Sequence, residues 1–175
     1  SHGGFCQRMT KRLILIRHAK SSWDAPFDDH ARTLDERGCN AATAIGDWLK
    51  DNGYLPDTIY SSDAARTRET TDRIVAALGT TAKILLKGAM YHANPATLLR
   101  VLQQAEGDTV ALVAHNPGIA VFAEDIVAMA PDHKRFFDYP TGATLVCDFD
   151  TNNWAEAVSR SGYVVDFIVP KDLSD

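Results

Sequence analysis

Short apolar runs alternate along this chain with longer segments in which apolar residues recur every three or four positions. Runs rich in isoleucine, leucine and valine predict strands, because a strand that is buried on both faces is apolar at consecutive positions. The predicted strands are residues 12–16, 58–60, 83–86, 109–114, 143–149 and 163–169, with 154–160 as a weaker candidate segment between the last two.

The longer segments carry the signals of helix ends. Residues such as serine, aspartate and asparagine cap a helix start, proline is favoured at the first helical position, and glycine follows a helix end. The four predicted helices are 41–50, the segment from the capping residues 61–63 to about Leu78, the segment from Asn94-Pro95 to Ala105, and the segment from Asn116-Pro117 to about Met129.

This alternation predicts an α/β fold, a three-layer sandwich with a mostly parallel sheet and helices on both faces. The last two predicted strands have no helix between them, so we expect them to form an antiparallel edge. The length of 175 residues fits a single domain. We expect that domain to cover residues 11–170, and residues 1–10 to be a leader or remnant outside it.

The composition narrows the class of protein. The net charge of −5 argues against a nucleic-acid binder, which usually carries a basic face. Cys6, Cys39 and Cys147 form no CxxC pair, so neither a disulfide framework nor a zinc site is indicated. Free thiols are typical of a reducing, cytoplasmic environment. No apolar run reaches the length of a membrane span, so we expect no membrane partner.

Polar residues follow the predicted strands at the points where each strand ends. Arg17 and His18 follow the first strand, and His115 follows the strand at 109–114. Arg66 lies one turn into the helix that follows the strand near Ile59. Ligands of α/β sheets bind at the carboxyl ends of the strands, so we expect these four side chains to converge.

Two arginines and two histidines at one sheet edge predict an anion site. A guanidinium group matches phosphate oxygens with paired N–H donors, and a helix starting near Asn116 adds backbone donors. A histidine among these cations stays neutral and can attack phosphorus, giving a phosphohistidine intermediate. The arginines would neutralise the charge that magnesium neutralises in kinases. We therefore expect neither a metal nor a cofactor.

Three motifs in order resemble those of the histidine phosphatase superfamily, also called the phosphoglycerate-mutase-like superfamily. They are LIRHAKSSW, SSDAARTRET and LVAHNPG. Together with DHARTLDERG, MYHA and PTGA, they resemble the small SixA-like phosphohistidine phosphatase branch. The resemblance covers residues 11 to 150. It implies that His18 is the nucleophile, that Arg17, Arg66 and His115 bind the phosphoryl oxygens, and that Ser21 and Asn116 contribute to substrate binding.

Two departures from the superfamily pattern matter. Ala19 replaces the usual glycine after the histidine, so the backbone there need not adopt a glycine-only conformation. Mutase-like relatives carry a glutamate general acid after the third strand, whereas residues 88–93 contain no carboxylate. His92 and Asp24 are candidates to replace it, although an exposed loop residue is the simpler interpretation of His92.

A missing acid favours substrates whose leaving group departs easily, such as phosphohistidine. We therefore expect a protein phosphohistidine phosphatase that acts on a phosphorylated protein or another phosphorylated substrate. A broad-specificity small-molecule phosphatase and a non-catalytic phosphate-binding module on the same fold remain the alternatives. The polar segment 28–38 is interpreted mainly as a solvated loop leading into a helix, with Asp35 near its cap. The alternative interpretation is a rim that contacts a protein substrate.

Overall fold

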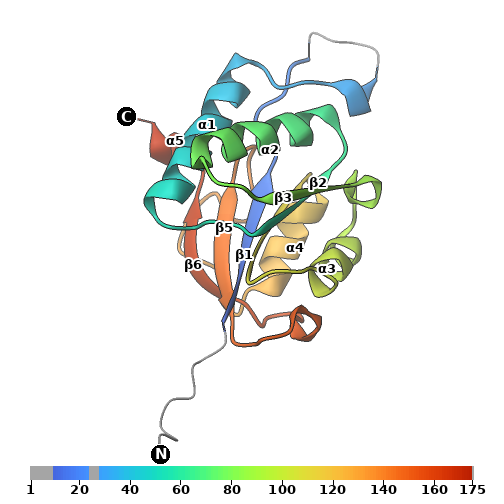
Figure 1. The fold of residues 1–175 in the computed structure, drawn as a ribbon, viewed down its shortest axis with the longest axis vertical. Coiled ribbons are helices and arrows are strands. Elements are labelled where there is room, and N and C mark those ends of the chain that lie inside the picture. Colours follow the sequence, from blue (N-terminus) through green and yellow to red (C-terminus); the bar gives the residue numbers. More distant parts are fainter. Residues whose placement is uncertain (1–9, 24–27, 175) are drawn as a thin grey trace, which may run out of the picture.

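A mixed sheet forms the centre of the computed structural model, which describes residues 10–23 and 28–174 (Figure 1). Cys6 and Asp24, which the sequence singled out, lie outside the described residues. The strands are β1 (Lys11–Arg17), β2 (Thr58–Ser62), β3 (Lys83–Lys87), β4 (Thr109–Ala114), β5 (Thr144–Phe149) and β6 (Tyr163–Ile168), in the spatial order β3-β2-β4-β1-β5-β6.

Four adjacent strands of the sheet are parallel, since β2 pairs in this way with β3 and β4, and β4 with β1. The β5 strand is antiparallel to both β1 and β6. The expected fold class, a mostly parallel sheet with an antiparallel edge, is confirmed. In the register of β1 and β4, Arg17 lies opposite Ala114, so both strands end at the same level.

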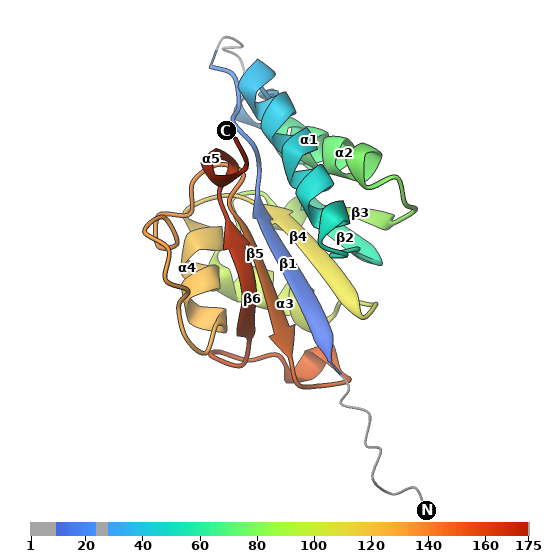
Figure 2. The same cartoon turned by 90° about the vertical axis from the view of Figure 1, so that its left-hand side faces the viewer.

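Helices cover both faces of the sheet, as Figure 2 shows edge-on. On one face lie α1 (Glu36–Asp51), α2 (Ala65–Leu78) and the short α5 (Pro170–Leu173), whose apolar side chains pack with those of the strands. On the other face lie α3 (Pro95–Gln103) and α4 (Gly118–Ile126), which form a second apolar layer. The sheet therefore carries one hydrophobic core on each side, and its residues at strand ends are held rigidly.

The first two helices begin differently from what the sequence predicts. The first helix starts at Glu36 rather than near residue 41. The expectation that Asp35 lies near its cap is confirmed, because the Asp35 side chain accepts a hydrogen bond from Gly38 N at 2.7 Å. Serines 61 and 62 do not cap α2. They lie within β2, and the helix follows Ala64 with no side-chain cap.

Two further expectations fail at the C-terminal side of the fold. The predicted helix to Met129 ends at Ile126, because Val127 turns to extended backbone and bridges to Gly162. The candidate segment 154–160 begins with a short 3₁₀ helix, Trp154–Glu156, in which the Trp154 indole donates a hydrogen bond to the carbonyl of Gly107 at 2.7 Å.

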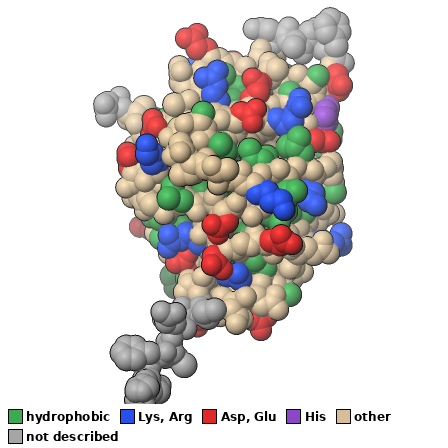
Figure 3. All heavy atoms as spheres, in the orientation of Figure 1, with side chains coloured by type: hydrophobic (Ala, Val, Ile, Leu, Met, Phe, Trp, Pro, Cys, Tyr) green, Lys and Arg blue, Asp and Glu red, His purple; other side chains and the backbone are tan. Residues whose placement is uncertain are grey.

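The surface carries charges of both signs. On the face formed by α1 and α2, basic and acidic side chains are interspersed rather than separated into patches (Figure 3). Within residues 10–23 and 28–174, no helix is both long and apolar enough to cross a membrane. Cys39 and the fully buried Cys147 are free thiols.

Candidate active site

The two histidines that follow β1 and β4 lie side by side. The backbone N–H of His18 donates to the carbonyl of Ala114 at 3.1 Å, which continues the strand pairing by one residue. The rings of His18 and His115 are 5.3 Å apart between centroids. Sequence positions almost a hundred residues apart are thus joined by the sheet, as the strand-end pattern predicts.

One ring nitrogen of His18 is fixed by its own loop. Nδ1 lies 2.7 Å from the carbonyl oxygen of Ala19, and because a carbonyl only accepts, Nδ1 must carry the proton. The neutral ring then has its lone pair on Nε2. Burial, assisted by the charges of Arg17, Arg66 and Arg32, lowers the pKa of His18 to about 3. The imidazole is therefore a neutral base at physiological pH.

The two predicted arginines lie near this ring, Arg66 buried and Arg17 partly buried. Arg66 is only 2% exposed, and its guanidinium donates to the backbone oxygen and the carboxylate of Asp29 at 2.7 and 3.0 Å. Arg17 donates to the carbonyl of Tyr139 at 3.2 Å. Burial, together with the charge of Arg66, lowers the pKa of Arg17, which indicates that the two cations lie close to one another.

The second histidine is held by a serine that the sequence analysis assigned only to a helix cap. Nε2 of His115 lies 2.8 Å from the hydroxyl of Ser62, the last residue of β2. Burial, with the nearby His18 and Arg66, lowers the pKa of His115 to about 3. His115 is therefore a neutral hydrogen-bonding group at physiological pH.

Unpartnered polar atoms identify what the cluster can bind. Among the residues that the structure describes, Nε of Arg17, Nε of Arg66 and Nδ1 of His115 are buried without a hydrogen-bond partner. Buried donors without partners are costly in an apolar environment, so they indicate a ligand with several acceptor oxygens. Two guanidinium groups and a neutral imidazole suit a tetrahedral anion such as phosphate.

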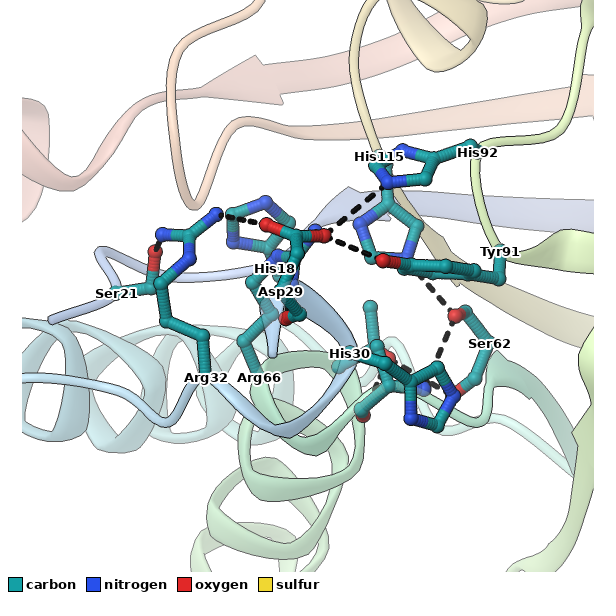
Figure 4. A network of polar contacts seen from close by, with 12 residues as sticks. His18, Ser21, Asp29, His30, Arg32, Ser62, Arg66, Tyr91, His92 and His115 are labelled. Carbon is teal, nitrogen blue, oxygen red and sulfur yellow. Dashed lines mark hydrogen bonds and ion pairs between the residues drawn. The ribbon is translucent and has the colours of Figure 1, made fainter. Parts of the chain in front are cut away.

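The segment before α1 supplies two site residues that the sequence analysis interpreted as solvated. Arg32 is 9% exposed and donates to the hydroxyl of Ser21 and, at 3.0 Å, to the carboxylate of Asp29. The Asp29 carboxylate also meets Arg66, so it bridges two arginines across the site (Figure 4). The interpretation of residues 28–38 as mainly solvated is wrong for these two side chains.

The loop after β3 covers the other side of the histidine pair. Tyr91 and His92 follow the 3₁₀ helix Gly88–Met90, and their rings lie 5.5 and 5.4 Å from that of His115. The Tyr91 hydroxyl donates to the Asp29 carboxylate, and Nε2 of His92 lies 3.2 Å from the same group. His92 is half exposed, but it is not a free loop residue.

The two expected binding residues occupy different positions relative to the cluster. Ser21 is buried and bonded to Arg32, so it supports an arginine beside His18. The Asn116 amide donates to the carbonyls of Asp138 and Tyr139 at 3.0 and 3.2 Å, and its Oδ1 is buried without a partner in the described chain. Helix α4 begins at Gly118, two residues beyond it.

Comparison with known proteins agrees with this geometry. The family model for the histidine phosphatase superfamily (branch 1) matches residues 13–87. A SixA-like protein of Agrobacterium tumefaciens, assigned as a phosphohistidine phosphatase, is 32% identical, with a TM-score of 0.76 over 91% of this chain and 98% of that one. This chain belongs to the histidine phosphatase superfamily. Its likeness to SixA proteins extends along nearly its whole length.

Two further relatives are also similar to this chain along nearly its whole length. A SixA-like structure from Nakamurella multipartitia is 27% identical with a TM-score of 0.76, covering 92% of this chain and 96% of that one. An uncharacterized protein of Mycobacterium leprae is 27% identical over 166 residues, which is 89% of this chain and all of that protein. The family relation supports a phosphatase, a hydrolase of phosphoryl groups.

Proposed function

We propose that this protein removes the phosphoryl group from phosphohistidine side chains of other proteins. The observation that carries the proposal is the neutral His18 ring, with its lone pair on Nε2, near the buried Arg66 and the partly buried Arg17. A neutral imidazole with an available lone pair is a nucleophile, and the arginines supply the positive charge that a transferring phosphoryl group requires.

The reaction then has two displacement steps. Nε2 of His18 attacks phosphorus, the bond from phosphorus to the substrate nitrogen breaks, and the phosphoryl group is held on His18. Water then attacks this intermediate and inorganic phosphate leaves. His18 recovers its lone pair on Nε2, while Nδ1 keeps its proton and continues to donate it to the carbonyl oxygen of Ala19. Arg17, Arg66 and His115 hold the phosphoryl oxygens throughout, so we expect turnover to persist in a metal chelator.

Ser21 and Asn116 act indirectly in this scheme. Ser21 orients Arg32, and Asn116 fixes the carbonyl of Tyr139, to which Arg17 also donates. We expect both residues to affect substrate binding through the arginines that they position.

Two observations favour a protein as the substrate. Asp29 and His92 at the rim are about half exposed, so a phosphorylated side chain can reach the buried floor from outside. A groove lined by Lys20, Arg37, Arg135 and Lys171 lies beside the site, since Lys20 follows the nucleophile loop directly. Such a groove suits an acidic protein surface. The SixA-like relatives, one of them 32% identical, point to phosphohistidine.

A substrate panel tests the proposal. A phosphorylated histidine-phosphotransfer protein, 3-phosphoglycerate and p-nitrophenyl phosphate are compared by kcat/KM, and His18→Ala is tested in parallel. We expect the phosphoprotein to be preferred and His18→Ala to lose both turnover and the acid-labile phosphoenzyme. Preference for 3-phosphoglycerate indicates a small-molecule phosphatase instead. Phosphate binding by the wild-type protein without turnover of any substrate indicates a non-catalytic module.

A further inference from the structure

His92 is anchored in a strained and well-defined position over the site. It is a non-glycine residue in the left-handed backbone region, with φ of 51°. The loop is anchored on either side, because Ala93 N donates to Met90 O at 3.3 Å and Asn94 caps α3. Gly118 makes room for this loop, since a Cβ there would lie 1.9 Å from the Ala93 carbonyl oxygen. Backbone strain of this kind is often found at functional positions.

The contact between His92 and Asp29 determines which ring nitrogen of His92 can exchange a proton. Hydrogen bonds from Tyr91 and from the arginines of the site hold the pKa of the Asp29 carboxyl well below its usual range. An ionised carboxylate only accepts, so Nε2 of His92 must donate to it. Nδ1 is then the ring nitrogen through which His92 can pass a proton to a ligand.

The other ionisable groups at the site cannot supply a proton at neutral pH. Burial keeps His18 and His115 neutral, with pKa values of about 3. Asp29 is ionised. Burial and the Asp29 carboxylate raise the pKa of Tyr91, whose proton is already engaged with that carboxylate. Among the described residues, His92 is the candidate that remains, with its ring next to that of His115.

We propose that His92 is the proton donor to the leaving group, and that Asp29 is the positioning residue that orients its ring. This inference rests on the proposed phosphatase function and adds a catalytic residue to it. The groups facing His92 are Asp29 from the segment before α1, Tyr91 from its own loop and His115 at the end of β4 (Figure 4).

The proton balance of both steps follows. As His18 Nε2 forms its bond to phosphorus, the bond from phosphorus to the leaving group breaks, and the leaving group takes the proton from Nδ1 of His92. For phosphohistidine the proton goes to the ring nitrogen not bonded to phosphorus, so imidazole departs neutral. In the second step, neutral His92 accepts a proton from the attacking water and is restored.

The test uses leaving groups of different basicity. p-Nitrophenoxide departs readily without a proton, whereas phenoxide benefits from one. We expect His92→Asn to raise the ratio of kcat/KM for p-nitrophenyl phosphate over phenyl phosphate by about 10²–10⁴-fold, the usual effect of losing a general acid. Asparagine tolerates the left-handed backbone, so the loop should remain folded. Added imidazole should restore part of the phenyl phosphate activity, because His92 is half exposed.

Two further variants complete the experiment. Asp29→Asn should also raise this ratio, because Nε2 of His92 loses the carboxylate to which it donates, and added imidazole should again restore part of the phenyl phosphate activity. The matched control is His30→Gln, because His30 also contacts the Tyr91 ring but its Nε2 lies 2.8 Å from the Asp63 carboxylate instead of Asp29. In this variant the ratio of kcat/KM for the two aryl phosphates should stay at the wild-type value.

Two results would overturn the proton donor. They are an unchanged ratio in His92→Asn and an equal rise in His30→Gln. The nucleophile is tested separately by His18→Ala, so each role can fail without the other.

Discussion

The burial of His18 makes the stability of the protein depend on pH in a way that one substitution can isolate. Desolvation and neighbouring arginines lower the pKa of His18 from 6.5 to about 3. Below pH 6.5 the unfolded chain therefore binds a proton that the folded protein accepts only near pH 3. The unfolded state binds more protons in this window, so stability decreases as the pH falls from 6.5 towards 3.

The magnitude at pH 5 follows from the same shift. This pH lies about 1.5 units below the ordinary histidine pKa and well above the folded value. At about 1.4 kcal/mol per unit, His18 lowers the free energy of unfolding by about 2 kcal/mol at pH 5 relative to pH 8. His18→Asn removes this contribution. The difference in unfolding free energy, wild type minus variant, should thus fall by about 2 kcal/mol between pH 8 and pH 5.

Urea unfolding at a series of pH values measures this difference, in buffers free of phosphate so that no anion stabilises the folded site. The matched control is Thr71→Val, because Thr71 is buried, does not titrate and has no hydrogen-bond partner for its hydroxyl among the described residues. Its difference from wild type should not vary with pH. A His18→Asn difference that is equally flat would refute the reasoning, because His18 would then be solvated in the folded protein.

Three further predictions address separate parts of the structure. Arg66→Lys should lower kcat by about 10²-fold in steady-state assays, because lysine lacks the paired donors of a buried guanidinium; an unchanged kcat would remove Arg66 from the phosphoryl site. Tyr139→Phe should lower the free energy of unfolding by about 1–3 kcal/mol in urea titrations, because the fully buried hydroxyl donates to Leu15 O at 2.6 Å; no loss would mean that the bond contributes nothing. Arg37→Glu should raise KM for an acidic phosphoprotein by up to about fivefold at low salt and leave p-nitrophenyl phosphate unaffected, whereas Arg73→Glu, outside the groove, should change neither.

The sequence predicts best the part of the site that the sheet builds. His18 and His115 follow continuous apolar runs, and strand pairing brings the ends of those runs to one level. A run of buried residues is visible in sequence, and the parallel arrangement follows from its alternation with helices. The pattern of apolar runs is therefore almost sufficient to predict the fold class and the positions of these two histidines.

The residues that the sequence misses lie on segments without periodicity. Asp29 and Arg32 belong to a short 3₁₀ turn and the residue after it, where polar side chains are normal whether or not they face a site. Helix starts were misplaced for a related reason: Ser61 and Ser62 are good capping residues, but pairing of β2 with its neighbours keeps them in the strand. At these two serines, the sheet overrules the local preference for a helix cap.

In the proposed mechanism, the strand ends and the loops have different roles. The strand ends carry the nucleophile His18 and His115, whose backbones are fixed by strand pairing. The loop-borne Asp29, Tyr91 and His92 would meet the departing side of the substrate, and they contact one another through the Asp29 carboxylate. Substitutions at the strand ends should therefore abolish phosphoryl transfer altogether. Substitutions in the loops should change which leaving groups are accepted, which is the property by which related phosphatases with the same sheet can differ.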